Sequence, residues 1–102
     1  MNEQDLFPAV GNHYLVDFQA FRVELFFKSM TSMTYTGIKE DGETVSITVE
    51  PIRDHLFLVT WQEADETTVV HLEDYKKETI ITCITGPNGE FSKFHGTSSL
   101  IS

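Results

Sequence analysis

Residues 55–74 read HLFLVTWQEADETTVVHLED, and this stretch decides the fold of the 102-residue chain. Apolar and polar side chains alternate on both sides of a short acidic segment, which predicts two antiparallel strands joined by a tight turn. The stretch also carries the only tryptophan, Trp61, and a carboxylate, Glu63, that shares a strand face with Phe57 and Val59. The fold and the candidate site are both expected to depend on this hairpin.

The length of the turn sets which side chains of the second strand face inward. With a three-residue turn over 64–66, His71 falls on the inner face. With a two-residue turn over 65–66, Val70 and Leu72 take the inner face instead, because a slip of one residue reverses every side chain. The apolar character of Val70 and Leu72 favours the shorter turn.

The same period of two runs through most of the chain and predicts about eight strands at intervals of roughly 8–12 residues. Asp41-Gly42 and the run 86–89, GPNG, have the composition of tight turns between strands. Eight antiparallel strands without a long crossover predict an all-β fold, an up-and-down antiparallel β-barrel of about eight strands, because closure removes exposed sheet edges. A two-sheet sandwich is the alternative. The alternating apolar positions are Tyr14, Val16, Phe18, Phe21, Val23, Leu25, Phe27, Met33, Tyr35, Val45, Ile47 and Val49.

The chain is long enough for one domain with a single core. Residues 1–12 are expected to form an N-terminal lead-in interrupted by Pro8 and Gly11, and residues 13–102 to form the barrel domain. Gly96 is expected to mark a strand terminus at which glycine permits a close approach of the backbone.

The composition is acidic, with seven Lys and Arg against 16 Asp and Glu and a net charge of −9. Nucleic acid and anionic membranes are recognised by clustered basic residues, and so neither is expected as a partner. One cysteine excludes an internal disulfide and fits a reducing compartment. The N-terminal MNEQDLF lacks the basic and apolar regions of a signal peptide. We expect a cytoplasmic protein.

An eight-stranded barrel has an interior just wide enough for side chains or for one small ligand. The aromatic-rich strands predict an apolar or aromatic small molecule as that ligand. Glu63 beside Trp61 would be a carboxyl group in an apolar pocket, and is the candidate catalytic residue as general acid or base. In the alternative reading Glu63 is solvated at the end of its strand. The predicted ligand-binding residues are Trp61, Glu63, Tyr14, Phe18, Tyr35, Phe57 and His71.

The sequence predicts no metal site and no cofactor. Motifs of serine hydrolases, phosphate loops and dinucleotide-binding folds are absent from it. No short metal-ligand spacing joins the four histidines, which are His13, His55, His71 and His95. Simple alternation would also leave Leu56, Leu58 and Phe26 on the outer face, and an apolar patch of this kind predicts a homodimer.

Several runs of the chain resemble the small calycin-type barrels, most closely the MoaF-like domains and more distantly the phenolic acid decarboxylases. The resemblance implies a calycin- or lipocalin-like barrel over nearly the whole chain, and the MoaF-like domains imply no particular reaction. The runs that carry it are FRVELFF (21–27), MTYTG (33–37), VTWQEADETTVVHLEDY (59–75), IITCIT (80–85), GEF (89–91) and FHGT (94–97).

Phenolic acid decarboxylases bind a hydroxycinnamate inside the barrel, with a Trp-x-Glu strand motif, a tyrosine pair on the first strand and an arginine. Trp61-Gln62-Glu63 matches the first element. Val16 and Phe18 stand in place of the tyrosine pair, and the connection over 37–45, GIKEDGETV, has no arginine. The sequence therefore favours a ligand-binding barrel, with a lyase or isomerase that uses Glu63, or a dimeric interaction module without ligand, as alternatives.

Overall fold

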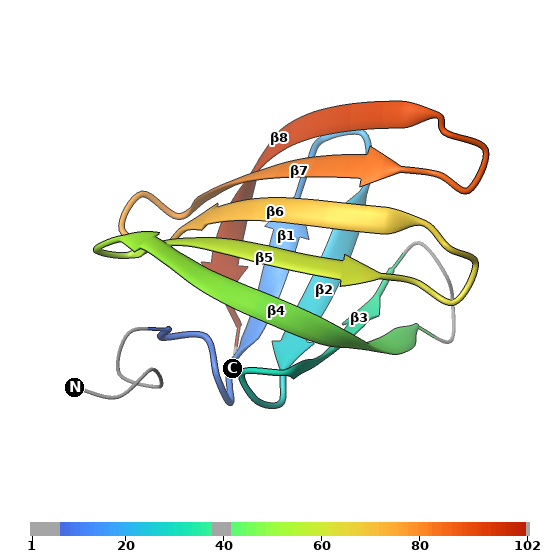
Figure 1. The fold of residues 1–102 in the computed structure, drawn as a ribbon. Coiled ribbons are helices and arrows are strands. Elements are labelled where there is room, and N and C mark those ends of the chain that lie inside the picture. Colours follow the sequence, from blue (N-terminus) through green and yellow to red (C-terminus); the bar gives the residue numbers. More distant parts are fainter. Residues whose placement is uncertain (1–6, 38–41, 102) are drawn as a thin grey trace.

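The computed structural model describes residues 7–37 and 42–101, which form a closed barrel of eight antiparallel strands (Figure 1). Each strand pairs with its neighbours in the sequence, and β8 pairs with β1 to close the barrel. The predicted up-and-down barrel is therefore confirmed. The strands are β1 (His13–Asp17), β2 (Arg22–Phe27), β3 (Ser32–Thr36), β4 (Glu43–Arg53), β5 (Leu56–Gln62), β6 (Thr68–Asp74), β7 (Thr79–Thr85) and β8 (Phe91–Leu100).

Some predictions fall outside the described residues. Asp41 of the predicted Asp41-Gly42 turn is one of these, as are residues 1–6 of the lead-in and residue 102. Across the described part of the chain, no helix has the length and apolar character needed to cross a membrane.

Burial along the strands follows the alternation in the sequence. In β5, Phe57, Val59 and Trp61 are buried, whereas Leu58 and Thr60 between them are only half-buried. The inner positions of the other strands form one continuous apolar core inside the barrel. Burial of these side chains is the main favourable term in folding, at about 25 cal/mol per Å² of apolar surface.

One end of the barrel is closed by aromatic rings. Phe7 lies outside the strands, yet it is only 1% exposed, and its ring centroid lies 5.3 Å from that of Phe27 and 5.0 Å from that of Phe57. The segment that carries Phe7 runs beneath the strands (Figure 1), where the amide of Gly11 donates to the carbonyl of Phe27 at 2.7 Å. Phe7 therefore acts as a plug at this end of the barrel.

The hairpin of β5 and β6 has the longer of the two predicted turns. Val59 pairs with His71, and the amide of Glu63 donates to the carbonyl of Thr67 at 2.7 Å. The expectation that Val70 faces inward is therefore wrong, because Val70 is 38% exposed and His71 is only 2% exposed. The three-residue turn places Glu66 at a positive φ of 75°, as hairpin turns of this length require.

Gly96 lies within β8 and not at a strand terminus, so that expectation is wrong. At this point β8 passes from pairing mainly with β7 to pairing with β1, beginning at Asp17 and Thr97. A Cβ atom at Gly96 would lie 2.7 Å from Cδ1 of Phe18 and closer still to the carbonyl oxygen of Asp17. The close backbone approach expected of this glycine is thus present at the β1–β8 seam.

Candidate functional site

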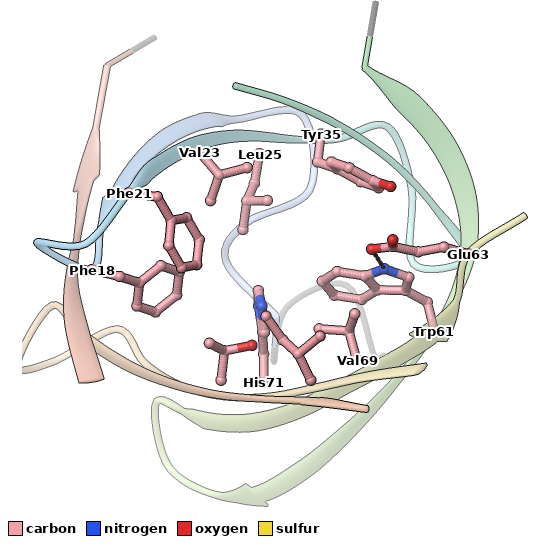
Figure 2. Close-up of a pocket in the computed structure, with 11 residues that line it drawn as sticks. Phe18, Phe21, Val23, Leu25, Tyr35, Trp61, Glu63, Val69 and His71 are labelled. Carbon is pink, nitrogen blue, oxygen red and sulfur yellow. Dashed lines mark hydrogen bonds between the residues drawn. The ribbon is translucent and has the colours of Figure 1, made fainter. Parts of the chain in front are cut away.

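A pocket lies inside the barrel, between Phe18 and Phe21 on one side and Trp61 on the other (Figure 2). None of the rings that contact Phe7 lines this pocket, which places it toward the opposite end of the barrel. Its cavity volume is about 50 Å³. One water molecule needs roughly 10–15 Å³, and pockets that enclose whole ligands have roughly 300–1,000 Å³. The cavity therefore suits the head group of a ligand whose body lies in the mouth. Its lining residues are Phe18, Phe21, Val23, Leu25, Tyr35, Trp61, Glu63, Val69, His71, Thr82 and Ile84.

Aromatic rings form much of the pocket wall. The indole of Trp61 lies edge-to-face with the imidazole of His71, with ring centroids 4.7 Å apart, and stacks at 6.4 Å with the ring of Tyr35. Across the pocket, Phe18 and Phe21 lie 5.0 Å apart (Figure 2). Flat apolar surfaces on facing sides suit a planar ligand.

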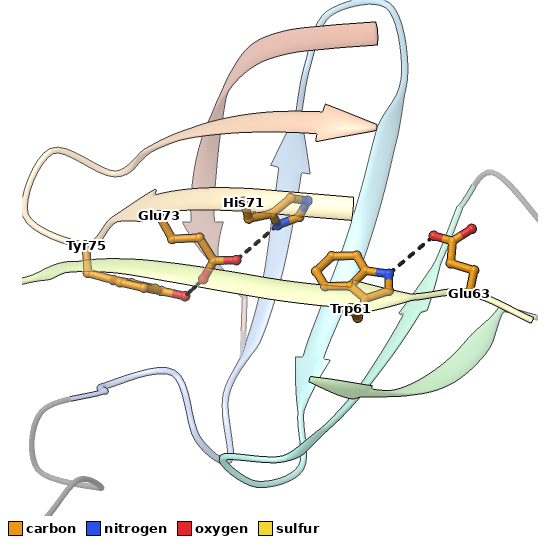
Figure 3. A network of polar contacts seen from close by, with 5 residues as sticks. All are labelled: Trp61, Glu63, His71, Glu73 and Tyr75. Carbon is orange, nitrogen blue, oxygen red and sulfur yellow. Dashed lines mark hydrogen bonds and ion pairs between the residues drawn. The ribbon is translucent and has the colours of Figure 1, made fainter. Parts of the chain in front are cut away.

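Three polar side chains on one face of β6 and its continuation form a hydrogen-bonded chain (Figure 3). Nδ1 of His71 lies 3.0 Å from Oε2 of Glu73, and the Tyr75 hydroxyl donates to Oε1 of Glu73 at 2.5 Å. His71 and Glu73 are 2% and 3% exposed. A buried carboxylate needs such donors, and accepting from both sides places the imidazole proton on Nδ1.

The other imidazole nitrogen of His71 is available to a ligand. Nε2 has no hydrogen-bond partner among the described residues, and the ring lines the pocket between Phe18 and Trp61 (Figure 2). Thr82 is paired with His71 across β6 and β7, and is fully buried. Its Oγ1 atom also has no hydrogen-bond partner in the part of the chain that the structure describes. An acceptor and a hydroxyl donor therefore adjoin the same small cavity.

Glu63 lies at the rim of the pocket and is half-buried. Its Oε2 atom accepts a hydrogen bond from Nε1 of Trp61 at 3.3 Å. Nearby, the hydroxyl of Tyr35 donates to Oε1 of Glu43 at 2.7 Å, and the amide of Ala64 donates to Oε2 of Glu43 at 2.8 Å. Two carboxylates at this rim make it acidic.

The sequence-predicted site residues separate into two groups. Tyr14 and Phe57 do not line the pocket, because they lie with Phe7, Phe27 and Tyr75 in the aromatic cluster at the opposite end. The predicted residues that the structure brings together in the pocket are Phe18, Tyr35, Trp61, Glu63 and His71.

Sequence reasoning missed Glu73, Tyr75 and Thr82. The available signal was the spacing of two in HLEDY, residues 71–75, which puts the first two of these polar groups on the same strand face as His71. The shorter predicted turn had placed that face outside the barrel.

No metal centre is formed by the residues that the structure describes, since no three His, Cys, Asp or Glu side chains gather there as ligands. His71 and Glu73 together supply two ligand groups, and both are engaged with each other.

All three tyrosines are expected to resist ionisation in the folded protein. Burial raises the pKa of Tyr35, and so does its hydrogen bond to Glu43. Burial and the charge of Glu73 raise the pKa of Tyr75 well above 10.0. Burial also raises the pKa of Tyr14, against a lowering by Asn12. Native protein should therefore show no tyrosinate absorbance as pH rises through 10, whereas protein in concentrated urea should titrate there.

The same shifts predict loss of stability in alkali. Because the folded pKa values exceed the unfolded value of 10.0, the stability linked to these phenols is complete below pH 10. It is lost as pH rises further, and circular dichroism should show unfolding together with phenol ionisation. A phenol that titrates near pH 10 while the barrel stays folded would contradict this expectation.

Comparisons with known proteins agree with the barrel. The family model described as MoaF-like matches residues 10–99. No curated protein sequence matches the chain. A crystal structure from Burkholderia vietnamiensis, of a protein described as a "putative beta-lactamase", has a TM-score of 0.85 and 23% sequence identity. The similarity covers 92% of this chain and 96% of that chain, and at this identity it establishes the fold alone.

Proposed function

We propose that this member of the MoaF-like family binds a small planar molecule through a hydrogen-bonding head group, in the small and mainly apolar cavity at one end of its barrel. The proposal rests on Oγ1 of Thr82, which is buried beside His71 and has no partner among residues 7–37 and 42–101. Leaving a buried hydroxyl unpaired costs about 1–3 kcal/mol. A bound head group would supply the missing partner.

The polar atoms of the cavity indicate the chemistry of this head group. Thr82 can donate a hydrogen bond through its hydroxyl, and Nε2 of His71 can accept one. In the described part of the chain, no lysine or arginine lines the pocket, whereas Glu63 does and Glu73 lies next to His71. A neutral carbonyl or hydroxyl group is therefore favoured over a carboxylate, which these negative charges would repel.

The apolar body of the ligand would lie outside the cavity, against the rings in its mouth. Trp61, Tyr35 and Phe18 present those rings. A cavity of about 50 Å³ accepts the narrow end of a molecule such as 2-indanone, a flat ketone, while the fused ring remains between the aromatic walls.

The test is a titration of Trp61 fluorescence, which reports on the pocket because Trp61 is the only tryptophan. We expect 2-indanone to shift the emission, and p-coumarate and ferulate to do so far less. Thr82→Val should weaken binding about five- to tenfold, because a hydrogen bond of this kind contributes about 1 kcal/mol. Calorimetric titration would measure the same affinities independently of fluorescence.

Thr82→Val should also make the ligand-free protein more stable by about 1 kcal/mol, because it removes an unpaired buried hydroxyl. Thr79→Val is the matched control, since Thr79 lies exposed on the same strand. This substitution should change neither the affinity for 2-indanone nor the stability of the ligand-free protein. A panel without any fluorescence response, or equal affinities of the wild type and Thr82→Val, would rule out the proposed site.

A further inference from the structure

Two hydrogen bonds in series, through Glu73 to Tyr75, hold the imidazole of His71. A residue that only binds a ligand does not need this second bond. Glu73 accepts from Nδ1 of His71, and the hydroxyl of Tyr75 fixes the second oxygen of Glu73 (Figure 3). The ring is also packed edge-to-face against Trp61, at 4.7 Å. These contacts leave one orientation and one tautomer, in which the lone pair of Nε2 is directed into the cavity.

We propose that His71 is a general base that moves a proton on a bound carbonyl compound, so that the barrel catalyses enolisation and isomerisation of small ketones. This inference rests on the proposed function, because the ketone must first occupy the pocket. His71 is the catalytic residue, and Glu73 and Tyr75 are positioning residues.

The proton transfer balances without a co-reactant. Nε2 of His71 takes a proton from the carbon next to the carbonyl group, and the electron pair of that C–H bond forms a carbon–carbon double bond. The carbonyl π electrons move to the oxygen, where the hydroxyl of Thr82 donates a hydrogen bond. The imidazolium exchanges its Nε2 proton with solvent and then delivers a proton to the same carbon, or, where the ketone is conjugated, to another carbon of the conjugated system.

Glu73 stabilises the charge that develops on the base. When Nε2 takes up a proton, His71 becomes a cation, and the carboxylate that accepts from Nδ1 at 3.0 Å compensates it in a buried setting. Thr82 from β7, Trp61 from β5 and Phe18 after β1 also contact or adjoin the ring, and none of them carries a charge. The compensating charge therefore comes from Glu73.

Glu63 has no part in this step. Its carboxylate accepts from the indole of Trp61, and the indole lies between Glu63 and the imidazole of His71 (Figures 2 and 3). Proton transfer by His71 is thus a different mechanism from a lyase reaction that uses Glu63, and mutation can separate the two.

The experiment follows the exchange of the α-protons of 2-indanone for deuterium in D₂O by proton NMR, with the full chain. General base catalysis should accelerate exchange by about 100-fold or more over buffer. His71→Gln should remove this acceleration while a fluorescence response to 2-indanone remains. His95→Gln is the matched control, because His95 is exposed on β8, and it should retain the full rate.

Glu73→Gln tests the positioning role through a spectroscopic signature. With Tyr75 donating to the amide oxygen, the amide nitrogen of the new side chain would face Nδ1 and donate to it, which moves the imidazole proton to Nε2. The ¹⁵N chemical shifts of His71 should report this change of tautomer. Exchange should fall to near the buffer rate, since the base then has no lone pair in the cavity.

The outcomes separate this inference from the proposed function. No fluorescence response to any compound would overturn both. A response to 2-indanone with exchange at the buffer rate would overturn the catalytic inference alone, as would an undiminished rate in His71→Gln. Loss of the acceleration in Glu63→Gln, with the rate retained in His71→Gln, would assign the base to Glu63 and overturn the inference.

Discussion

Replacing Phe7 with alanine is expected to lower the free energy of unfolding by about 3–5 kcal/mol, the usual range for a fully buried phenylalanine. Phe7 is only 1% exposed, and its ring meets Phe27, Phe57 and Tyr75 edge-to-face. Phe27 and Phe57 belong to the same packed core, so they cannot fully fill the space that the ring of Phe7 leaves. The loss should therefore include both apolar transfer and an unfilled cavity.

Urea denaturation followed by circular dichroism would measure this effect. A domain of this size has a stability of about 5–15 kcal/mol, and so the variant should remain folded or nearly so. Phe91→Ala is the matched control, because Phe91 is 63% exposed on β8 and its loss should cost less than about 0.5 kcal/mol. Equal effects of the two substitutions would show that Phe7 does not close the barrel in solution.

Gly96→Ala is expected to destabilise the barrel by about 3 kcal/mol or more, at the upper limit of overpacking effects. The added Cβ would clash with the carbonyl oxygen of Asp17 and lie 2.7 Å from Cδ1 of Phe18. The first of these contacts is with backbone, so β1 and β8 must separate to relieve it. The amides of the β1–β8 seam should then lose protection from hydrogen exchange before those of β4 and β5.

Gly86→Ala provides the control for Gly96. The nearest atom to a Cβ at Gly86 is the side-chain Oδ1 of Asn88 at 3.2 Å, and a side chain can move away at low cost. The expected change is below about 1 kcal/mol. If Gly96→Ala lowered the free energy of unfolding no more than Gly86→Ala does, β1 and β8 would not approach each other as closely at Gly96 as described.

Much of the barrel could be predicted because alternation is a local property of the chain. Val45, Ile47 and Val49 alternate with polar residues, and in the structure they face the interior or its edge. Phe18, Tyr35 and Trp61 were expected at the site for the same reason, and they line the pocket.

Alternation does not state how far along the barrel axis an inward side chain lies. Tyr14 and Phe57 face inward as expected, yet they reach the end that Phe7 closes. Their position depends on the tilt and stagger of all the strands together, which no single segment contains. The two ends of the barrel therefore could not be told apart from the sequence.

The face of β6 shows why the remaining part of the site needed the whole fold. The apolar character of Val70 favoured an inward position for its side chain. Hydrophobicity along the sequence does not include the hydrogen bonds that form only once the barrel has closed. In the barrel, His71 is buried because Glu73 accepts from its Nδ1, Tyr75 donates to Glu73 in turn, and Trp61 covers the ring. Side-chain period was enough to set the strands and the meander. Which polar groups meet in the buried interior was decided by the register and packing of the closed barrel.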